Sequence, residues 1–173
     1  MTVRGTTTPQ ERVFGALPYL LPLIQVMVFS GPFVAMVPAA AIILQPLMPL
    51  VLLYFTVPFL GLAIFFGLFM LVVRNEALPH FIRFNSLQAL VIGISLTIAE
   101  VLFFQVLGPV FGFAMGPNLA VSVAGPSAFL VETLFNFLFL GVFAASTYSI
   151  VQVLRGHYPE IPTISDVVYM QVR

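Results

Sequence analysis

Four long apolar stretches divide this 173-residue chain and restrict it to folds that pack apolar helices in a membrane. They cover residues 13–29, 51–73, 84–107 and 128–154. Only 7% of the residues are charged, whereas a soluble domain carries about a quarter. A helix of about 20 apolar residues crosses the hydrocarbon core of a bilayer. The sequence therefore predicts an all-α, polytopic membrane protein, with four transmembrane helices in one domain over residues 1–173.

The stretch between the first two spans is apolar but is broken by prolines. Residues 39–45 are the longest part of it that proline leaves free to be helical, because proline removes a backbone donor. Two turns are too short to cross a membrane. We therefore expect residues 31–50 to form an interfacial or re-entrant segment, broken at Pro32, Pro38, Pro46 and Pro49.

Arginine is the only strongly basic residue in the chain, and its distribution predicts the topology. With four spans, all six arginines fall on one side of the membrane, and the remaining connections carry none. A fifth crossing within residues 31–50 would separate the arginines. Since basic loops stay on the cytoplasmic side, both termini are predicted to be cytoplasmic or stromal. The six are Arg4, Arg12, Arg74, Arg83, Arg155 and Arg173.

The sequence also excludes several classes of chemistry. It has no cysteine and no lysine, and it contains no nucleophile elbow, HExxH helix or phosphate-binding glycine loop. We expect no enzyme activity and no cofactor or metal site. The two histidines, His80 and His157, are isolated on the arginine side and are expected to cap helices at the interface. Zero net charge without a basic run argues against a nucleic-acid partner.

Polar residues within the third span predict its inward face. Asn85 and Gln88 lie about one turn apart on a face of small and polar residues, which suits contact with another helix. The opposite face, with Leu90, Ile94 and Ile98, is expected to meet lipid.

Two acids fall inside the apolar spans. Glu100 lies in the third span, whereas Glu132 lies in the fourth, one turn before Asn136. An acid within the membrane is a functional hypothesis by default. The alternative is a protonated acid hydrogen-bonded to a neighbouring helix. Asn136 has the same two interpretations, as a functional residue or as a contact between helices.

Several segments resemble the Tic-twenty family, which includes a subunit of the protein-import translocon of the chloroplast inner envelope. The resemblance is most specific over residues 72–89, which contain Arg83-Phe-Asn-x-x-Gln88, and over residues 148–166. It implies four helices, stromal or cytoplasmic termini, and a channel-forming or channel-associated role in protein translocation. The short N-terminus lacks a transit sequence. We therefore expect a cyanobacterial-type member in a plasma or thylakoid membrane.

Three functions fit the sequence. The first is a translocation or membrane-insertion subunit, which would act as an oligomer or with other membrane subunits, since four helices pack into a solid bundle. Its substrate would be a polypeptide. The second is a small-solute or ion transporter that uses Glu100 and Glu132. The third is a scaffold for other membrane complexes.

Overall fold

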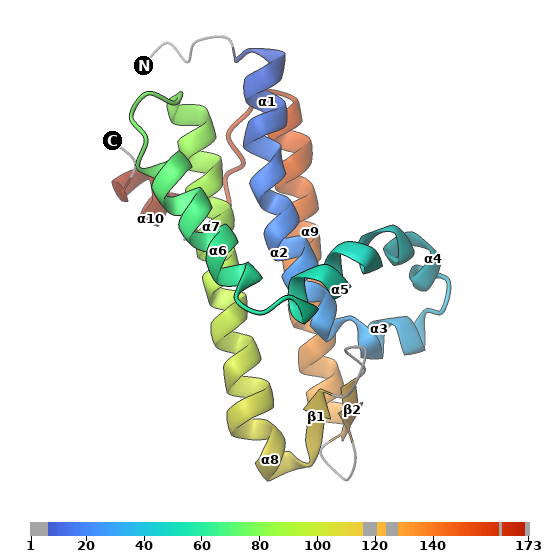
Figure 1. Cartoon of the computed structure of the whole chain (residues 1–173). Coiled ribbons are helices and arrows are strands. Elements are labelled where there is room, and N and C mark those ends of the chain that lie inside the picture. Colours follow the sequence, from blue (N-terminus) through green and yellow to red (C-terminus); the bar gives the residue numbers. More distant parts are fainter. Residues whose placement is uncertain (1–6, 116–120, 124–127, 163, 172–173) are drawn as a thin grey trace.

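In the computed structural model, which describes residues 7–115, 121–123, 128–162 and 164–171, three long helical rods form a bundle with a lateral arm (Figure 1). The first rod runs without a break over Pro9–Phe29. It comprises α1 (Pro9–Ala16), η1 (Leu17–Tyr19), α2 (Leu20–Val26) and η2 (Met27–Phe29).

The first rod stays continuous despite two internal prolines. Pro18 and Pro22 fall in the first turns of η1 and α2, where a missing amide hydrogen leaves no helical bond unmade. The rod begins at a capping box in which the Thr8 hydroxyl accepts from the Glu11 amide at 3.3 Å. The Glu11 carboxylate accepts from the Thr8 amide in return at 3.1 Å.

The arm consists of short helices that follow one another between residues 31 and 56. They are α3 (Gly31–Met36), α4 (Ala40–Leu44), η3 (Gln45–Leu47) and α5 (Met48–Thr56). Pro32, Pro46 and Pro49 each lie in the first turn of such a helix. The expectation that the longest uninterrupted helix here covers only residues 39–45 is wrong, since Ala40–Thr56 is helical throughout. A proline in the first turn starts a helix as readily as it ends one.

A sharp bend follows the arm. The helices α6 (Leu60–Gly67) and η4 (Leu68–Val73, a π-helix) run back along the bundle. Their axis makes an angle of 99° with that of the preceding helix. Residues 51–73 are thus not one straight helix, and the bend lies at Pro58. Among the described residues, three helices are long and apolar enough to cross a membrane, or up to four if the bent pair counts as one span.

The bend requires an unusual backbone conformation at Phe59, whose φ is 61°. Left-handed backbone costs a residue with a β-carbon about 1 kcal/mol, a cost that glycine avoids. We expect Phe59→Gly to raise stability by about 1 kcal/mol and Phe59→Val to lower it, as measured by thermal unfolding in detergent. Since Phe59 is 81% exposed, its side chain has little packing to lose. Equal stability of the two variants would contradict a left-handed bend.

The second rod, His80–Phe111, is longer than the sequence suggested. It joins α7 (His80–Glu100), η5 (Val101–Leu107, a π-helix) and α8 (Gly108–Phe111). The expected end of the third span at residue 107 is wrong, because the helix continues into α8, where Pro109 lies in the first turn. The helix ends instead at Gly112, whose φ is 72° and whose amide donates to the Gly108 carbonyl at 2.9 Å.

The third rod is α9 (Ala128–Leu154), which has the same range as the helix predicted there. It ends in a glycine cap: the Gly156 amide donates to the Val153 carbonyl at 2.8 Å, and Gly156 has a φ of 83°. Between the second and third rods lies an antiparallel pair, β1 (Phe113–Met115) and β2 (Val121–Val123). After α9 the chain turns back to α10 (Ile164–Gln171), which packs on α7.

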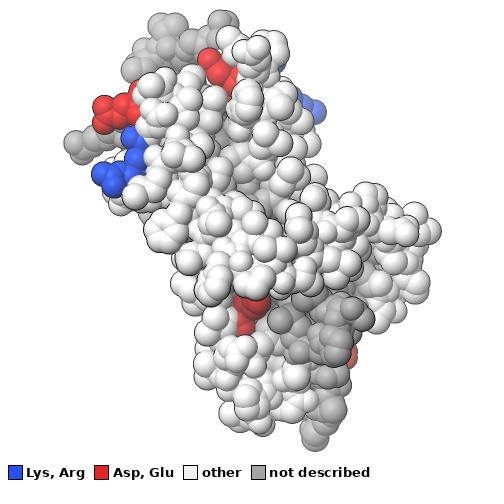
Figure 2. Space-filling model, in the orientation of Figure 1, with Lys and Arg blue, Asp and Glu red and all other residues white. Residues whose placement is uncertain are grey.

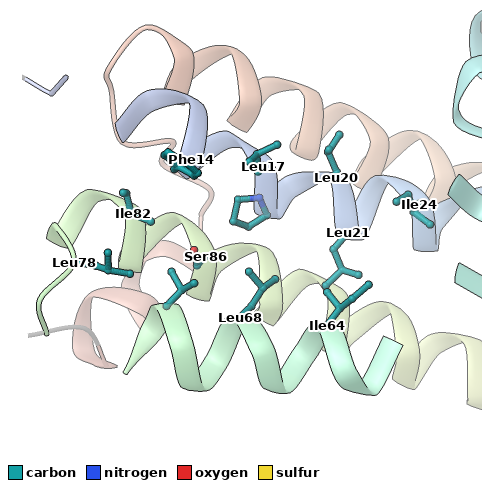
Figure 3. A pocket seen from close by; sticks show the side chains of 12 residues that line it. Phe14, Leu17, Leu20, Leu21, Ile24, Ile64, Leu68, Leu78, Ile82 and Ser86 are labelled. Atoms are coloured by element: carbon teal, nitrogen blue, oxygen red, sulfur yellow. The ribbon is translucent and has the colours of Figure 1, made fainter. Parts of the chain in front are cut away.

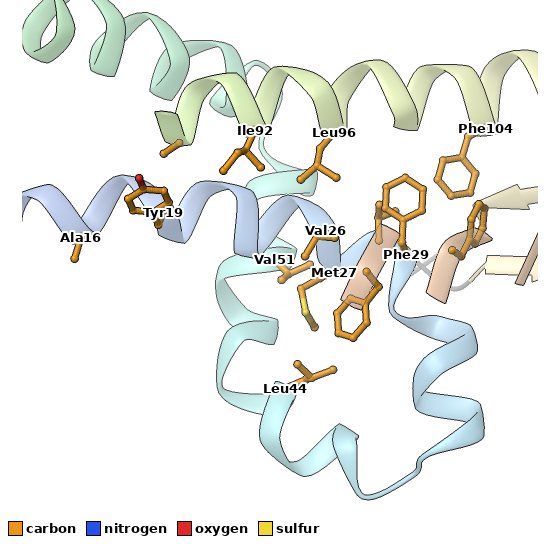
Figure 4. Close-up of a cluster of buried hydrophobic side chains, with 14 of the residues drawn as sticks. Ala16, Tyr19, Val26, Met27, Phe29, Leu44, Val51, Ile92, Leu96 and Phe104 are labelled. Atoms are coloured by element: carbon orange, nitrogen blue, oxygen red, sulfur yellow. The ribbon is translucent and has the colours of Figure 1, made fainter. Parts of the chain in front are cut away.

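The first rod is the centre of the bundle, with α7 on one side and α9 on the other. Its fully buried side chains include Tyr19, Val26 and Phe29. The Phe29 ring lies 5.1 Å from that of Phe135 on α9 and 5.8 Å from that of Phe104 (Figure 4). Side chains therefore fill the space between the described rods.

The helices α6 and η4 cover the other side of α7 over only part of its length. Leu90, which was expected to meet lipid, is 1% exposed because it packs there with Leu21 and Val73. Further along the rod, Ile94 and Ile98 remain exposed, as the sequence suggested.

The described arginines gather at one end of the bundle. Arg12 and Arg83 lie in the first turns of their rods, whereas Arg74 and Arg155 follow the last residues of η4 and α9. Figure 2 shows the basic atoms of the visible face at this end. We call it the arginine end. Arg4 and Arg173 lie outside the described residues.

Candidate functional site

Arg83 joins two helices at the arginine end. Its Nε donates to the Val73 carbonyl at 2.9 Å, which satisfies one of the free carbonyls at the end of η4. Together with Arg74 and Glu76 it lines a cleft of about 320 Å³ between η4, α7 and α10. This cleft therefore brings charged side chains of both signs together at the arginine end.

Asn85 is fully buried and connects α7 to the first rod. Its Oδ1 accepts from the Tyr19 hydroxyl at 3.1 Å, and its Nδ2 donates to the Phe81 carbonyl at 2.7 Å. The helices approach closely here because Gly15 has no side chain. A β-carbon at Gly15 would lie 3.1 Å from Val153 Cγ1. Asn85 therefore acts as an interhelical contact next to a small residue, a common arrangement in membrane helix packing.

Gln88 is also fully buried, and it holds the C-terminal segment. Its Nε2 donates to the Pro159 carbonyl at 3.2 Å. The Ser165 hydroxyl donates to the same carbonyl at 3.3 Å and accepts from the Ile161 amide at 2.8 Å. The two segments that carried the family resemblance, residues 72–89 and 148–166, thus contact each other in the fold.

Aromatic rings reinforce this contact. The Tyr158 ring lies 5.1 Å from those of both Phe81 and Phe84, and the Tyr169 ring of α10 lies 4.5 Å from that of Phe84. His80 Nδ1 and the Tyr158 hydroxyl are 3.1 Å apart. Within the described residues, no group of three acids or histidines is arranged to hold a metal ion.

The remaining predicted residues are on different rods. Glu100 is half-buried on α7, whereas Glu132 is exposed on the surface of α9. Asn136 is half-buried, and its Oδ1 has no hydrogen-bond partner among the described residues. Glu132 therefore does not share the inward position of Asn85 and Gln88.

A second buried polar group was missed from the sequence. Gln25 of α2 is 6% exposed, and its Nε2 donates to the Tyr54 hydroxyl at 2.8 Å. The same nitrogen lies 3.5 Å from Thr97 Oγ1 on α7. Gln25 is the one amide side chain within the apolar residues 13–29. Its isolation there could have predicted a polar contact with another helix.

An apolar groove of about 470 Å³ runs between the first rod and the pair α6–η4 (Figure 3). Leu17 and Leu21 line one wall, and Ile64 and Leu68 line the other. Ser86 of α7 lies between the walls, with its hydroxyl buried and without a described partner. Apart from Ser86, the side chains that line this groove are apolar.

Long apolar helices, buried amide contacts between them and arginines gathered at one end are typical of a class of membrane proteins. The protein is an all-helical protein with three or four helices suited to crossing a membrane. Residues 6–168 match the family described as "Chloroplast import apparatus Tic20-like". The chain belongs to this family, the Tic-twenty family of the sequence resemblance.

Individual relatives agree with the family assignment. The chain is 42% identical to a "Tic20 family protein" of Synechocystis sp. over 173 residues, which is all of this chain and 99% of that protein. It is 32% identical to "Tic20 family protein Ycf60" of Porphyra purpurea, covering 99% of this chain and 80% of the relative. It is 29% identical to "Protein TIC 20-II, chloroplastic" of Arabidopsis thaliana, covering 96% and 76% respectively.

Proposed function

We propose that this chain is a membrane subunit that acts in protein translocation across, or insertion into, a cyanobacterial-type membrane. The observation that carries the proposal is the match to the chloroplast import family over residues 6–168, which is nearly the whole chain. The full-length relationship to a Synechocystis protein supports a member of the cyanobacterial type.

The proposed topology has four crossings, with the arginine end in the cytoplasm. The arginines at one end support it, since basic loops stay on the cytoplasmic side. Ser30, where the arm begins, is 18 residues from Arg12, or about 27 Å along a helix. A hydrocarbon core is about 30 Å thick. The arm then lies near the opposite surface, as an interfacial or re-entrant segment.

A polypeptide would not pass through the middle of one such bundle. Tyr19, Val26 and Phe29 fill the centre, as expected for a solid helix bundle. A path therefore requires several copies or partner subunits, and it follows a lateral surface of the bundle. In this proposal Arg83, Asn85 and Gln88 hold the helices and the C-terminal segment in place. Glu100, Glu132 and Asn136 are the candidates for contact with substrate or partners.

Photo-crosslinking in cells tests this function. A photo-reactive amino acid replaces Ile98, which is 63% exposed on α7, and the control replaces Leu96, which is 3% exposed on the same helix. We expect adducts to many polypeptides from position 98, lost when protein synthesis stops, and none from position 96. A single constant adduct would instead favour a scaffold. The absence of any polypeptide adduct from position 98 would overturn the proposal.

A further inference from the structure

We propose that a polar recess on the lateral surface of the bundle binds a membrane-spanning helix through a basic side chain. Gln25, Tyr54 and Thr97 are the polar side chains that line the recess. Glu100 does not line it, but it lies about one turn beyond Thr97 on α7, farther from the arginine end. This inference rests on the proposed function, because it names a binding site and a class of substrate for a translocation subunit.

The recess is a cavity of about 400 Å³ between α2, α5, α6 and α7. Its rim is apolar and open to the surroundings: Leu62 is 54% exposed and Ile94 is 43% exposed. In a membrane, a rim of this kind faces lipid tails. A ligand would therefore enter from the bilayer and bring an apolar surface of its own.

The bend at Phe59 leaves the recess uncovered. The pair α6–η4, Leu60–Val73, is about 21 Å long, whereas the rod His80–Phe111 is about 48 Å long. Because α5 turns away by 99°, no described helix covers this side of α7 beyond the bend (Figure 1). Ile98 is exposed for that reason.

Two glycines make room for the polar groups. A β-carbon at Gly61 would lie 2.5 Å from the Tyr54 hydroxyl, and one at Gly93 would lie 2.8 Å from Gln25 Oε1. Any larger residue would displace these side chains. The recess is therefore shaped to keep an amide and a phenol at this depth in the bundle.

The recess has an excess of hydrogen-bond acceptors. Gln25 uses its Nε2 for Tyr54 and Thr97, while Thr97 Oγ1 donates to the Gly93 carbonyl at 3.1 Å. Gln25 Oε1 is buried, and no described group donates to it. Because an unsatisfied carbonyl is unfavourable in an apolar environment, a donor on a ligand would be bound favourably.

Glu100 adds a carboxyl group, and within the described residues no basic side chain lies near enough to balance its charge when it ionises. The described arginines and histidines lie at the arginine end, and Arg83 is 17 residues away, or about 25 Å along the helix. Since acids within a membrane pair with a partner of opposite charge, the matching cation is expected to come from another molecule.

A transmembrane helix with a lysine or arginine satisfies these conditions together. Its apolar residues pack on Leu62, Ile94 and Ile98, and the long stem of the basic residue reaches into the recess. The cationic group then pairs with the Glu100 carboxylate next to the recess, where Gln25 Oε1 has no described donor. Charge-assisted hydrogen bonds of this kind are about twice as strong as neutral ones.

Association of the full-length protein with synthetic single-span peptides in phosphatidylcholine liposomes tests the proposal. Because the chain has no cysteine, a single Glu160→Cys label at the arginine end serves as the energy-transfer acceptor. The peptides are leucine–alanine helices that carry either one lysine or a leucine at the depth of Glu100. We expect the lysine peptide to bind about tenfold more tightly, which corresponds to about 1.4 kcal/mol.

Two acid variants make the test specific. Glu100→Gln should reduce the lysine preference to less than about twofold, whereas Glu76→Gln, the same change at an exposed acid of the arginine end, should retain it. Equal binding of both peptides to the unchanged protein would overturn the proposal, and so would a lysine preference that survives Glu100→Gln. Ile98→Trp, at the exposed rim, provides a second variant that should weaken the preference without a change in a buried residue.

The result separates this site from the general function. If position 98 crosslinks to polypeptides in cells but lysine and leucine peptides bind equally, the translocation role stands and the basic ligand is wrong. If the lysine peptide is preferred but no polypeptide is captured in cells, the recess binds a membrane partner and the translocation role fails.

Discussion

Gly15→Leu is expected to destabilise the bundle by about 3 kcal/mol, the upper end of the usual cost of overpacking. Gly15 lies where the central rod packs closely against both neighbours. A β-carbon there would lie 3.1 Å from Val153 Cγ1 on α9 and 3.2 Å from Phe81 Cε1 on α7. Leucine adds further atoms beyond that point, so both helices must shift and the Tyr19–Asn85 hydrogen bond lengthens.

Thermal unfolding in detergent measures this effect, and the chain offers a matched control. Gly141 lies on the exposed surface of α9, and a β-carbon there would meet no atom within 4 Å. Both variants gain similar helix propensity, but only Gly15→Leu forces atoms into a packed contact. Gly141→Leu is therefore expected to be neutral or slightly stabilising. A loss of 3 kcal/mol lowers the melting temperature by about 6–12 °C for a chain of this size. Equal melting temperatures for the two variants would contradict the close crossing at Gly15.

Gln88→Leu is expected to release the C-terminal segment while the rods stay folded. The change removes the hydrogen bond to the Pro159 carbonyl, which is worth about 1 kcal/mol. The same carbonyl keeps its bond from Ser165, so it is not left without a donor. Opening of α10 should therefore become about fivefold more frequent, and amide hydrogen exchange over Ile164–Gln171 should accelerate by the same factor.

The control for this change is Gln105→Leu, at an exposed position of η5 on the same rod. It makes the same chemical substitution far from the C-terminal segment and should leave exchange in α10 unchanged. If Gln88→Leu and Gln105→Leu give equal exchange rates, Gln88 does not hold the segment. The presence of Gln88 in the run Arg83-Phe-Asn-x-x-Gln88, which carries the family resemblance, would then need another explanation.

Much of the fold follows from local patterns. The range of α9 was predictable because a long apolar run ends at Arg155-Gly156, and glycine there adopts the left-handed conformation of a helix cap. The inward positions of Asn85 and Gln88 followed from helical periodicity, since both amides would otherwise face lipid.

Other features depended on contacts between distant segments. Leu90 looks like a lipid-facing residue until α6 and η4 are placed beside α7. The angle of the 99° bend was not predictable, because Pro58 marks a break without fixing its angle. The left-handed conformation at Phe59 was not predictable either, since phenylalanine rarely adopts a positive φ. The prolines of the arm wrongly suggested that residues 31–50 are mostly non-helical. A proline that ends one helix can also lie in the first turn of the next.

The site was harder to predict than the fold. Polarity alone identified Glu100 and Glu132 equally, yet Glu100 is half-buried beside the recess and Glu132 is exposed. The recess combines Gln25, Tyr54 and Thr97, which lie on three helices far apart in the sequence. Its existence depends on where α5 turns away from the bundle, and this tertiary feature has no signature in the sequence of any one helix.

Labelling of single cysteines in intact cells tests the proposed arrangement most directly, because the native chain contains no cysteine. Gln10, Glu76 and Glu160 lie at the arginine end, whereas Ala114 lies at the opposite end of the bundle. Four crossings predict that cysteines at 10, 76 and 160 resist a membrane-impermeant reagent until the cells are opened, while a cysteine at 114 reacts from outside or from the lumen. A cysteine at 76 that reacts on the opposite side from those at 10 and 160 would contradict the four-crossing arrangement and the lateral site built on it.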